Sequence, residues 1–308
     1  MKQPRIAVAG NINADLSYLV SRLPHPGETL LADGMTVGLG GKASNASVAL
    51  ARLGAAPLLI GSVGADELGV LALSELEREG VATDSIVRRS GSGTGVASVL
   101  VAAHGENAIV THLGANMEMQ IGELPSLDGC RALLLTLGLA PAVSSALAAE
   151  ARAHGVKLVV DATPLRGQPP PLEILAADVL SANRVEAEQL LGHAIGSDDE
   201  TSIMSACAEL RALGAQAVVL KLGERGAAWA QADGHGRVAA PAIQAVDPTG
   251  AGDAFMAGLT LRLVQGCPLP VAVNFACLLG ALSASGLGAQ GGWSTSADVE
   301  RFAAMVSA

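Results

Sequence analysis

The sequence contains few aromatic residues, few basic residues and few charges overall. One Tyr, three Phe and two Trp make up only 2% of its 308 residues, which leaves little aromatic surface on which nucleic-acid bases could stack. Lys and Arg number 19 against 29 Asp and Glu, and the formal net charge of -10 argues against binding to nucleic acid or to anionic membranes. Because half of the residues are hydrophobic and only 16% are charged, the composition also excludes intrinsic disorder.

Cysteines and long apolar runs are scarce as well. The four cysteines form no CxxC pair, so they predict neither a zinc site nor a disulfide framework, and we interpret them as buried thiols in a reducing compartment. The apolar run near the N-terminus is too short for a signal peptide. The uncharged stretch 263–297 is interrupted by Pro268, Pro270 and several glycines, so it does not predict a bilayer span. We therefore expect a cytoplasmic protein without a membrane partner.

The sequence does contain a regular alternation of short aliphatic runs and helix-like segments. The aliphatic runs are continuous, as in parallel strands that are covered on both faces, and they occupy residues 5–10, 57–62, 132–137, 156–161, 179–182 and 217–222. Helical spacing follows at residues 43–53, 67–79, 143–154, 184–191 and 201–213, and several of these segments end at a glycine that suits a C-terminal cap. This pattern predicts a doubly wound α/β fold with a mostly parallel central sheet.

Two stretches depart from this alternation. Residues 16–37 and 85–112 contain Val- and Thr-containing runs in which apolar and polar residues alternate more strongly. Gly and Pro separate these runs, and the pattern indicates antiparallel strands. We expect them to form a small β-sheet lid over one edge of the main sheet. Ligands of such sheets bind outside the carboxyl ends of the strands, where a lid would exclude water.

The first candidate ligand-binding loop is GLGGKASN at residues 38–45, directly before a predicted helix. It does not match a Walker A loop, and no carboxylate follows at the distance that a dinucleotide-binding fingerprint requires. Its glycines leave backbone N–H groups open to an oxygen-rich ligand, and Lys42 and Asn45 add donors. An ordinary tight turn is the alternative.

The second candidate loop is DPTGAGD at residues 247–253, directly before a helix predicted over 254–264. Gly250 and Gly252 allow the backbone to wrap closely, and the helix N-terminus directs N–H donors and a partial positive charge toward an anion. Asp253 could simply cap the helix. If a phosphoryl group binds at this N-terminus, however, its carboxylate can accept the proton of an attacking hydroxyl group.

Three further polar groups follow predicted strands. Asn13 and Asp15 come after the first strand and are either ligands for hydroxyl groups or residues of an Asx turn. Asn183 and Glu186 are one helical turn apart, which suits Mg²⁺ held through water or a plain N-terminal cap. The turn KLGERG at 221–226 carries two cations and is either a hairpin or part of a binding site.

Taken in order, these segments resemble the ribokinase-like carbohydrate kinases, also called the pfkB family, and the GEN, HLGAN and GGKASNA motifs are most similar to the ribokinase branch. The resemblance runs nearly from end to end of the chain. It is carried by GNINAD (10–15), PGET (26–29), GGKASNASVALARLG (40–54), TGV (94–96), GEN (105–107), GAN (114–116), NRVEAE (183–188), KLGERG (221–226), DPTGAGD (247–253) and GAQ (288–290).

The resemblance implies a single domain over residues 1–308, an αβα sandwich with a β-sheet lid, and ATP-dependent phosphorylation of a sugar hydroxyl group. Asp253 would be the general base, and the backbone N–H groups of Gly250, Ala251 and Gly252 would stabilise the developing negative charge. The residues that would hold the sugar are Asn13, Asp15, Gly41, Lys42, Asn45 and Asp253.

The resemblance also implies a nucleotide site and two cation sites. The residues that would bind ATP are Asn183, Lys221, Gly223, Glu224, Gly226, Gly252 and Cys277. Glu186 would act on Mg²⁺ through water. A monovalent cation such as K⁺ would be bound by Asp247, Thr249, Ser283, Gly286 and Gly288.

Three positions depart from the ribokinase branch. Gly292 stands where that branch has a serine that is the last ligand of the monovalent cation, so the cation site is either weaker or completed by Ser294. Gly138 stands where that branch has a glutamate that contacts the sugar, so the preferred hydroxyl pattern differs from ribose. Cys277 replaces a frequent asparagine near the adenine, which predicts a more apolar base pocket.

The missing glutamate would permit a nucleoside kinase of the same family, and a non-catalytic sugar-binding protein is the alternative from another class. If the lid exposes one apolar face, two lids would pair in a homodimer.

Overall fold

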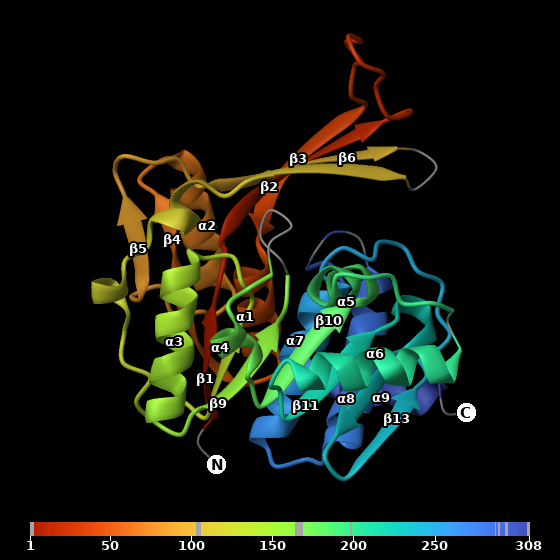
Figure 1. Cartoon of the computed structure of the whole chain (residues 1–308). Helices are drawn as coiled ribbons and strands as arrows, with labels where there is room; N and C mark the ends of the chain where they lie inside the picture. The colour runs from red at the N-terminus through yellow and green to blue at the C-terminus, as the bar shows by residue number, and fades with distance from the viewer. Residues whose placement is uncertain are drawn as a thin grey trace.

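A nine-stranded sheet runs through the middle of the molecule (Figure 1). The computed structural model describes residues 3–102, 106–163, 169–197, 199–286, 288, 290–292 and 295–306. In spatial order the strands are β13 (Gly234–Val238), β12 (Ala227–Gln231), β11 (Ala217–Lys221), β10 (Val179–Asn183), β9 (Lys157–Asp161), β8 (Ala132–Leu135), β1 (Arg5–Ala9), β4 (Ala56–Gly64) and β5 (Ile86–Arg89). All neighbours pair in parallel except β11–β12 and β12–β13.

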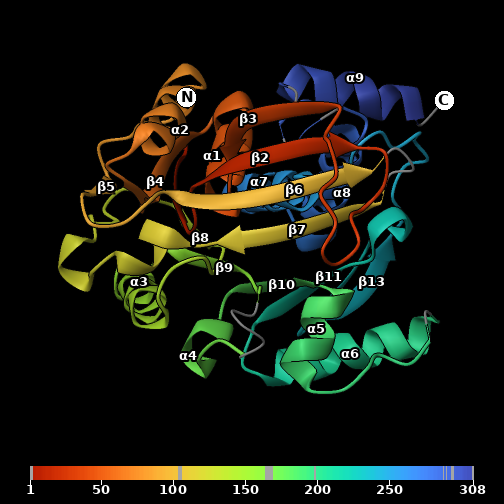
Figure 2. The ribbon, with the colours of Figure 1, turned by 90° about the horizontal axis from the view of Figure 1, so that it is seen from above.

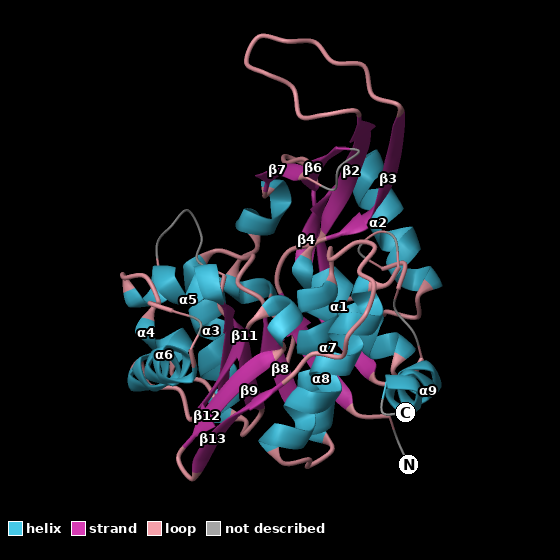
Figure 3. Ribbon diagram, turned by 90° about the vertical axis from the view of Figure 1, so that its right-hand side faces the viewer, coloured by secondary structure: helices cyan, strands magenta, loops and turns pink. Residues whose placement is uncertain are grey.

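Helices cover both faces of this sheet (Figure 3). One face packs against α1 (Lys42–Arg52), α2 (Glu67–Arg78), α7 (Ala251–Val264), α8 (Leu269–Ala284) and α9 (Ser296–Val306). The other face packs against α3 (Pro141–Ala153), α4 (Leu172–Leu175), α5 (Arg184–Leu191) and α6 (Glu200–Ala212). Short 3₁₀ turns lie at η1 (Gly114–Glu118), η2 (Ile121–Glu123) and η3 (Gly223–Arg225).

The core has two layers because successive strand residues point to opposite faces. In β1, Ile6 and Val8 pack toward α1 and α7, whereas Ala7 and Ala9 pack toward α3. Both faces of the strand are therefore buried, which explains why the central strands appear in the sequence as unbroken aliphatic runs.

The six predicted strands and the helices predicted between them are all present, with bounds that shift by at most two residues. The predicted ribokinase-like αβα sandwich is confirmed by this architecture. The hairpin alternative for residues 221–226 is realised, because β11 and β12 pair in antiparallel around this turn, but the continuation of the edge into β13 was not predicted. The strands β12 and β13 contain Trp229, Gln231, His235 and Arg237, and an edge strand with one solvated face lacks the aliphatic run that marks the central strands.

A smaller, four-stranded sheet lies across one end of the large one (Figure 2). Its strands, in spatial order, are β3 (Gly34–Gly40), β2 (Asn13–Val20), β6 (Gly95–Ala102) and β7 (Asn107–His112). The pairs β2–β3 and β6–β7 are antiparallel as expected, but β2 and β6 pair in parallel. The two excursions leave the same edge of the main sheet in the same direction, so their first strands meet side by side with the same polarity.

Residues 86–89, which the sequence placed in the second lid excursion, instead form β5 and pair with β4 in the large sheet. The small sheet thus begins at Gly95 in this half of the chain and at Asn13 in the other. Within the described ranges, no helix combines the length and the apolar character that crossing a bilayer requires.

Candidate active site

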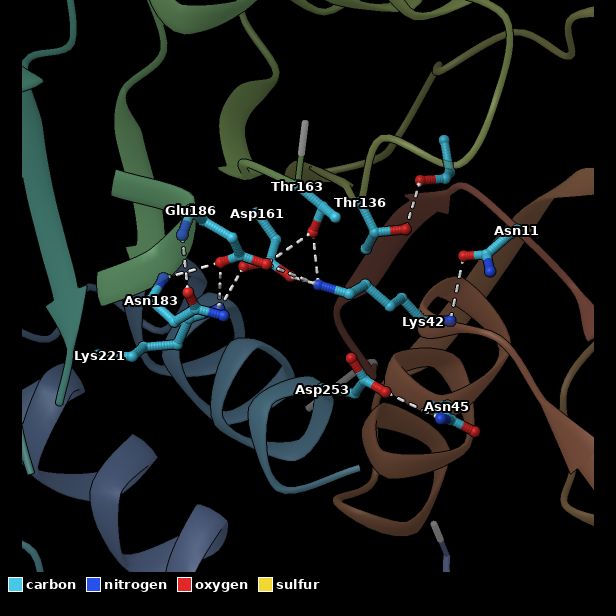
Figure 4. Close-up of polar contacts among 11 residues, drawn as sticks. Asn11, Lys42, Asn45, Thr136, Asp161, Thr163, Asn183, Glu186, Lys221 and Asp253 are labelled. Carbon is cyan, nitrogen blue, oxygen red and sulfur yellow. Dashed lines mark hydrogen bonds and ion pairs between the residues drawn. The ribbon is translucent and has the colours of Figure 1, made fainter. Parts of the chain in front are cut away.

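The predicted site residues gather at one edge of the large sheet, beneath the small sheet (Figures 1 and 4). Parallel strands bring their carboxyl ends to a common edge, and here β1, β9, β10 and β11 end next to the N-termini of α1, α5 and α7. This topology explains how segments that are far apart in the sequence supply one polar site.

The most densely bonded part of this edge is a lysine–carboxylate cluster formed by Lys42, Asp161, Thr163, Glu186 and Lys221 (Figure 4). Lys42 Nζ donates to Asp161 Oδ2 (3.1 Å), Thr163 Oγ1 (2.5 Å) and Glu186 Oε1 (3.2 Å). Lys221 Nζ donates to the other oxygen of Asp161 and lies 4.0 Å from Glu186 Oε2. The positive charges of two ammonium groups and the negative charges of two carboxylates therefore balance within this cluster.

Asp161 is the central anion of this cluster, and its side chain is only 1% exposed. Burial opposes its ionisation, but the charges of Lys221 and Lys42 outweigh burial and lower the pKa of Asp161 to about 2. Burial likewise opposes the charge on Lys42, and the nearby carboxylates outweigh it and raise the pKa of this lysine. Lys42 is thus held in its cationic form at the edge of the site.

Asn183 and Glu186 form the N-terminal cap of α5. Asn183 Oδ1 accepts a hydrogen bond from the backbone N of Glu186 (2.9 Å), and Glu186 Oε2 accepts one from the backbone N of Asn183 (2.7 Å). The capping alternative is therefore realised. The same Glu186 also belongs to the lysine–carboxylate cluster, because Thr163 Oγ1 donates to its Oε1 (2.9 Å).

Asp253 lies in the first turn of α7 and faces α1. Its Oδ2 accepts a hydrogen bond from Asn45 Nδ2 (2.8 Å), and Asn45 Oδ1 in turn accepts one from Gln290 Nε2 (3.2 Å). Burial raises the pKa of Asp253 to about 6 even though Lys42 and the hydrogen bond from Asn45 favour its charged form. A carboxyl group with this pKa is ionised at neutral pH and can still accept a proton.

Asp15 approaches the same region from the small sheet. Burial, and then the charge of Asp253, raise the pKa of Asp15 to about 6. Gly40 lies opposite this carboxylate, and a Cβ on Gly40 would overlap it. Asn13 lies on the same face of β2, but it is 3% exposed and its Oδ1 accepts a hydrogen bond from the buried Asn116 (3.0 Å).

Gly41 shapes the start of α1. Its φ of 94° is in the region that favours glycine, and a Cβ there would lie 2.5 Å from the backbone O of Asn11. The next residue, Lys42, donates its backbone N–H to Asn11 Oδ1 (3.1 Å).

A cavity of 730 Å³ adjoins Asp253 on the side of β11 and α8. All of the predicted nucleotide-binding residues except Asn183 line it, namely Lys221, Gly223, Glu224, Gly226, Gly252 and Cys277. Apolar side chains including Ile243, Pro248 and Phe255 form much of its wall. Burial raises the pKa of the Cys277 thiol to about 12, so this residue is neutral and adds to the apolar surface.

The loop that begins at Asp247 is held by its own carboxylate. Asp247 Oδ1 accepts a hydrogen bond from Thr249 N (2.9 Å), and Oδ2 accepts one from Gly288 N (3.0 Å). Burial opposes its ionisation, but these bonds outweigh burial and lower the pKa of Asp247. Ser283 and Gly286 lie at the adjacent end of α8, where Gly286 N donates to Ser283 O (3.2 Å). The structure thus brings the five residues of the predicted monovalent-cation site together.

Four polar residues of this site were missed by the sequence reasoning: Asn11, Asp161, Thr163 and Gln290. Asp161 carried a usable signal, because it is a carboxylate at the carboxyl end of a predicted buried strand, and Asn13 and Asp15 were identified because they follow another such strand. The contact of Gln290 with Asn45 depends on the complete fold, so no local sequence pattern indicated it.

Known proteins resemble this chain in sequence over most of its length. A family model described as pfkB family carbohydrate kinase matches residues 3–296. The ribokinase of Mus musculus is 33% identical over 264 residues, which cover 84% of this chain and 81% of that protein. A deoxyribokinase of Salmonella typhi is 29% identical over 289 residues, which cover 92% and 94% of the two chains.

Solved structures show the same fold. The structure of Arabidopsis thaliana ribokinase complexed with ribose and ATP matches with a TM-score of 0.88 at 28% identity, over 98% of this chain and 99% of that one. A ribokinase from Thermotoga maritima matches with a TM-score of 0.85 at 27% identity, over 97% and 99% of the two chains.

The chain belongs to the pfkB family of carbohydrate kinases. It is therefore a phosphotransferase with an alcohol group as acceptor, a sugar kinase, and the prediction of an enzyme rather than a non-catalytic sugar-binding protein is confirmed. The comparisons also support ATP as its nucleotide. Mg²⁺, K⁺, the homodimer and the cytoplasmic location stay predictions.

Proposed function

We propose that this chain transfers the γ-phosphoryl group of ATP to a hydroxyl group of a sugar, with Asp253 as general base. The observation that carries this proposal is the position of Asp253 between two sub-sites. Its neighbour Gly252 lines the 730 Å³ cavity, whereas its own carboxylate bonds to Asn45 and lies close enough to Asp15 to raise the pKa of that residue. An acceptor beside Asp15 and Asn45 and a nucleotide in the cavity would meet at Asp253.

The proton transfer follows from the electrostatics of Asp253. A hydroxyl group becomes a better nucleophile as its proton passes to a base during attack on phosphorus. With a pKa of about 6, Asp253 is ionised at neutral pH and remains a stronger base than an ordinary aspartate. Deprotonation of the acceptor is the role that these properties favour.

The N-terminus of α7 would stabilise the charge on the transferring group. Ala251 N already donates to Pro248 O (3.1 Å), so it is not an open donor. Gly252 N has no acceptor in the part of the chain that the structure describes, and it opens toward the cavity at the positive end of a 14-residue helix. Of the three predicted donors, Gly252 therefore has the strongest support.

The lysine–carboxylate cluster would meet the phosphates of ATP. Lys221 lines the cavity, and Lys42 shares Asp161 with it, so both ammonium groups lie where a polyphosphate would pass toward Asp253. The sequence placed Lys42 among the sugar ligands, yet its ammonium group contacts Glu186 at 3.2 Å. We propose that Lys42 acts at the transferring phosphoryl group, between the two substrates.

The two predicted cations fit this chain in different ways. Mg²⁺ prefers oxygen ligands and usually keeps several waters while it binds nucleotide phosphates, which suits a single outer contact from Glu186. No group of three His, Cys, Asp or Glu side chains in the described ranges could hold a metal alone. Asp247, with the carbonyl groups of Thr249, Ser283, Gly286 and Gly288 near it, offers the all-oxygen donor set that an alkali cation such as K⁺ takes.

We also propose that the small sheet is a lid through which two copies pair. Strand register puts Leu16, Tyr18, Met35, Val37 and Val110 on the face opposite to Asp15. Three of them are strongly exposed, Met35 at 53%, Val37 at 41% and Val110 at 73%. A second lid would cover this apolar face in a symmetric homodimer.

The reaction is tested by measuring ADP release from Mg-ATP in the presence of K⁺ across pentoses, hexoses, their phosphates and nucleosides. We expect turnover with a sugar and a loss of at least about 100-fold in Asp253→Asn, which keeps the shape of the side chain but cannot accept the proton. The matched control is Asp233→Asn in an exposed turn, which should match the wild type. Unchanged turnover in Asp253→Asn would contradict the proposed base.

A further inference from the structure

The carboxyl ends of β1 and β8 approach so closely that position 138 has no room for a side chain. A Cβ on Gly138 would lie 2.6 Å from both the Cβ and the backbone N of Asn11, and 2.8 Å from its Oδ1. Real Cβ atoms essentially never show such distances, and neither the backbone N nor the Cβ of Asn11 can move away by a change of rotamer. The side chain of Asn11 therefore occupies the space that a residue at position 138 would otherwise use.

The orientation of the Asn11 amide is fixed by its contact with α1. Asn11 Oδ1 accepts a hydrogen bond from the backbone N of Lys42 (3.1 Å), and because a backbone N–H can only donate, the oxygen of the amide must face it. The Nδ2 group consequently takes no part in the contact with Lys42 (Figure 4). Among the residues that the structure describes, Asn11 Nδ2 has no hydrogen-bond partner, and the side chain is half-buried.

Asn11 is joined to the same helix end as the proposed acceptor site. Lys42 is the first residue of α1, and Asn45, one turn later, donates to Asp253. The carboxylates that face the acceptor, Asp15 and Asp253, can accept hydrogen bonds but cannot donate them when ionised. An amide donor at the same helix end would complement these carboxylates, because each sugar hydroxyl group can both donate and accept.

We propose that Asn11 contacts the acceptor directly and donates a hydrogen bond from Nδ2 to one of its oxygens, in place of any side chain at position 138. This inference rests on the proposed function and deepens it. The acceptor that fits has an oxygen at this point that can accept a hydrogen bond from Nδ2. If this oxygen belongs to a hydroxyl group, its proton is directed to another partner. The glutamate that the ribokinase branch has at position 138 is then replaced by a different polar group, the amide of Asn11 after β1, and not by an empty space.

The test compares one substitution that removes only the donor of the amide with another that removes both its donor and its acceptor. Asn11→Asp keeps an oxygen that accepts the Lys42 N–H and removes the donor, whereas Asn11→Ala removes both. Both variants should raise the KM for the acceptor by about 10-fold and change the KM for ATP by less than about 2-fold. Asn274→Ala, on the exposed side of α8, is the matched control and should leave both constants unchanged.

Two results would overturn the inference. If Asn11→Asp keeps the wild-type KM for the acceptor, the Nδ2 donor is not used. If the KM for the acceptor and the KM for ATP rise equally in both variants, Asn11 acts only by holding α1. Thermal unfolding with each acceptor alone distinguishes the inference from the proposed function. A wild type that is stabilised by a sugar but does not phosphorylate it contradicts the proposed function, and the Asn11 variants then test the contact by their loss of that stabilisation. A wild type that responds to no acceptor contradicts both.

Discussion

Buried charges at this site are compensated by partners that come from distant parts of the chain. Asp161 bonds to Lys42, 119 residues away in the sequence, and to Lys221, 60 residues away. The sequence locates each of these residues at the end of a strand or the start of a helix, but only the assembled sheet brings them into contact. For this reason Lys42 and Lys221 could be identified from local motifs, whereas the role of Asp161 as the counter-ion that they share could not.

The compensation predicts a specific pattern of stability changes. Asp161→Asn leaves the buried ammonium group of Lys221 without its anion, so we expect the free energy of unfolding to fall by about 3 kcal/mol. The double variant Asp161→Asn/Lys221→Met removes both charges and should recover at least half of this loss. Urea unfolding measures both values.

An exposed pair provides the control. Glu75→Gln breaks the surface contact with Arg78 and should change the unfolding free energy by no more than about 0.5 kcal/mol. A double variant as unstable as Asp161→Asn alone would contradict the compensation.

The raised pKa of Asp253 predicts how the effect of its substitution on stability depends on pH. Folding moves this pKa from its usual value near 4 to about 6, so the folded state binds the proton more tightly than the unfolded state. Wild-type stability should therefore fall as the pH rises through this window, and the loss is complete above it. Asp253→Asn removes the penalty and should raise the Tm by about 2–4 °C at pH 8.

The same comparison at low pH serves as its control. Near pH 4 the wild-type carboxyl group is protonated in the folded state, so the difference in Tm between Asp253→Asn and the wild type should nearly vanish. Calorimetry at the two pH values measures it. A Tm difference that is equal at both would contradict a raised pKa.

At the scale of elements, the central strands were predictable and the edges were not. A strand buried on both faces is largely apolar along its whole length, and β1 and β8 therefore appear in the sequence as continuous apolar runs of strand length. The edge strand β13 and the short β5 pair on one side only, and their sequences carry polar residues that a loop could equally contain. Helix ends were easier, because the glycines after α1, α2 and α3 have the positive φ angles that a left-handed cap requires.

The turn between β11 and β12 shows why an element can depend on one glycine. Gly226 has a φ of 85°, and a Cβ there would overlap the backbone O of Val238 on β13. Gly226→Ala should therefore lower the unfolding free energy by about 2 kcal/mol and raise the KM for ATP several-fold, since this turn lines the nucleotide cavity.

Gly122→Ala is the control, because a Cβ on Gly122 meets nothing within 4 Å. It should leave the KM for ATP unchanged and the unfolding free energy within about 0.5 kcal/mol of the wild type. If Gly226→Ala and Gly122→Ala changed the unfolding free energy and the KM for ATP equally, strain in this turn could not be the cause.

At the scale of the whole molecule, two hairpins from separate parts of the chain combine into one small sheet, the proposed lid. The alternating pattern indicated strands in both excursions, but the parallel pairing of β2 with β6 depends on where each hairpin leaves the main sheet. The apolar outer face of this sheet is the basis for the proposed homodimer.

Val110→Asp tests this pairing. A charge on the outer face of β7 would have to be buried between two lids, so we expect a dimer in the wild type and a monomer of half the mass in the variant. Light scattering coupled to gel filtration measures the mass. Leu172→Asp, equally exposed on α4 but far from the lid, should leave the dimer intact. A wild type that is monomeric at working concentration would contradict the proposal.

The most direct test of the account is to identify the phosphorylated product. Phosphorus NMR of the enzyme with Mg-ATP and an accepted sugar should show equal amounts of ADP and a sugar monophosphate, and Asp253→Asn should form at least about 100-fold less of both per unit time. ADP with inorganic phosphate and no sugar phosphate would contradict phosphoryl transfer to the sugar. Sugar phosphate formed by Asp253→Asn at the wild-type rate would contradict Asp253 as the base.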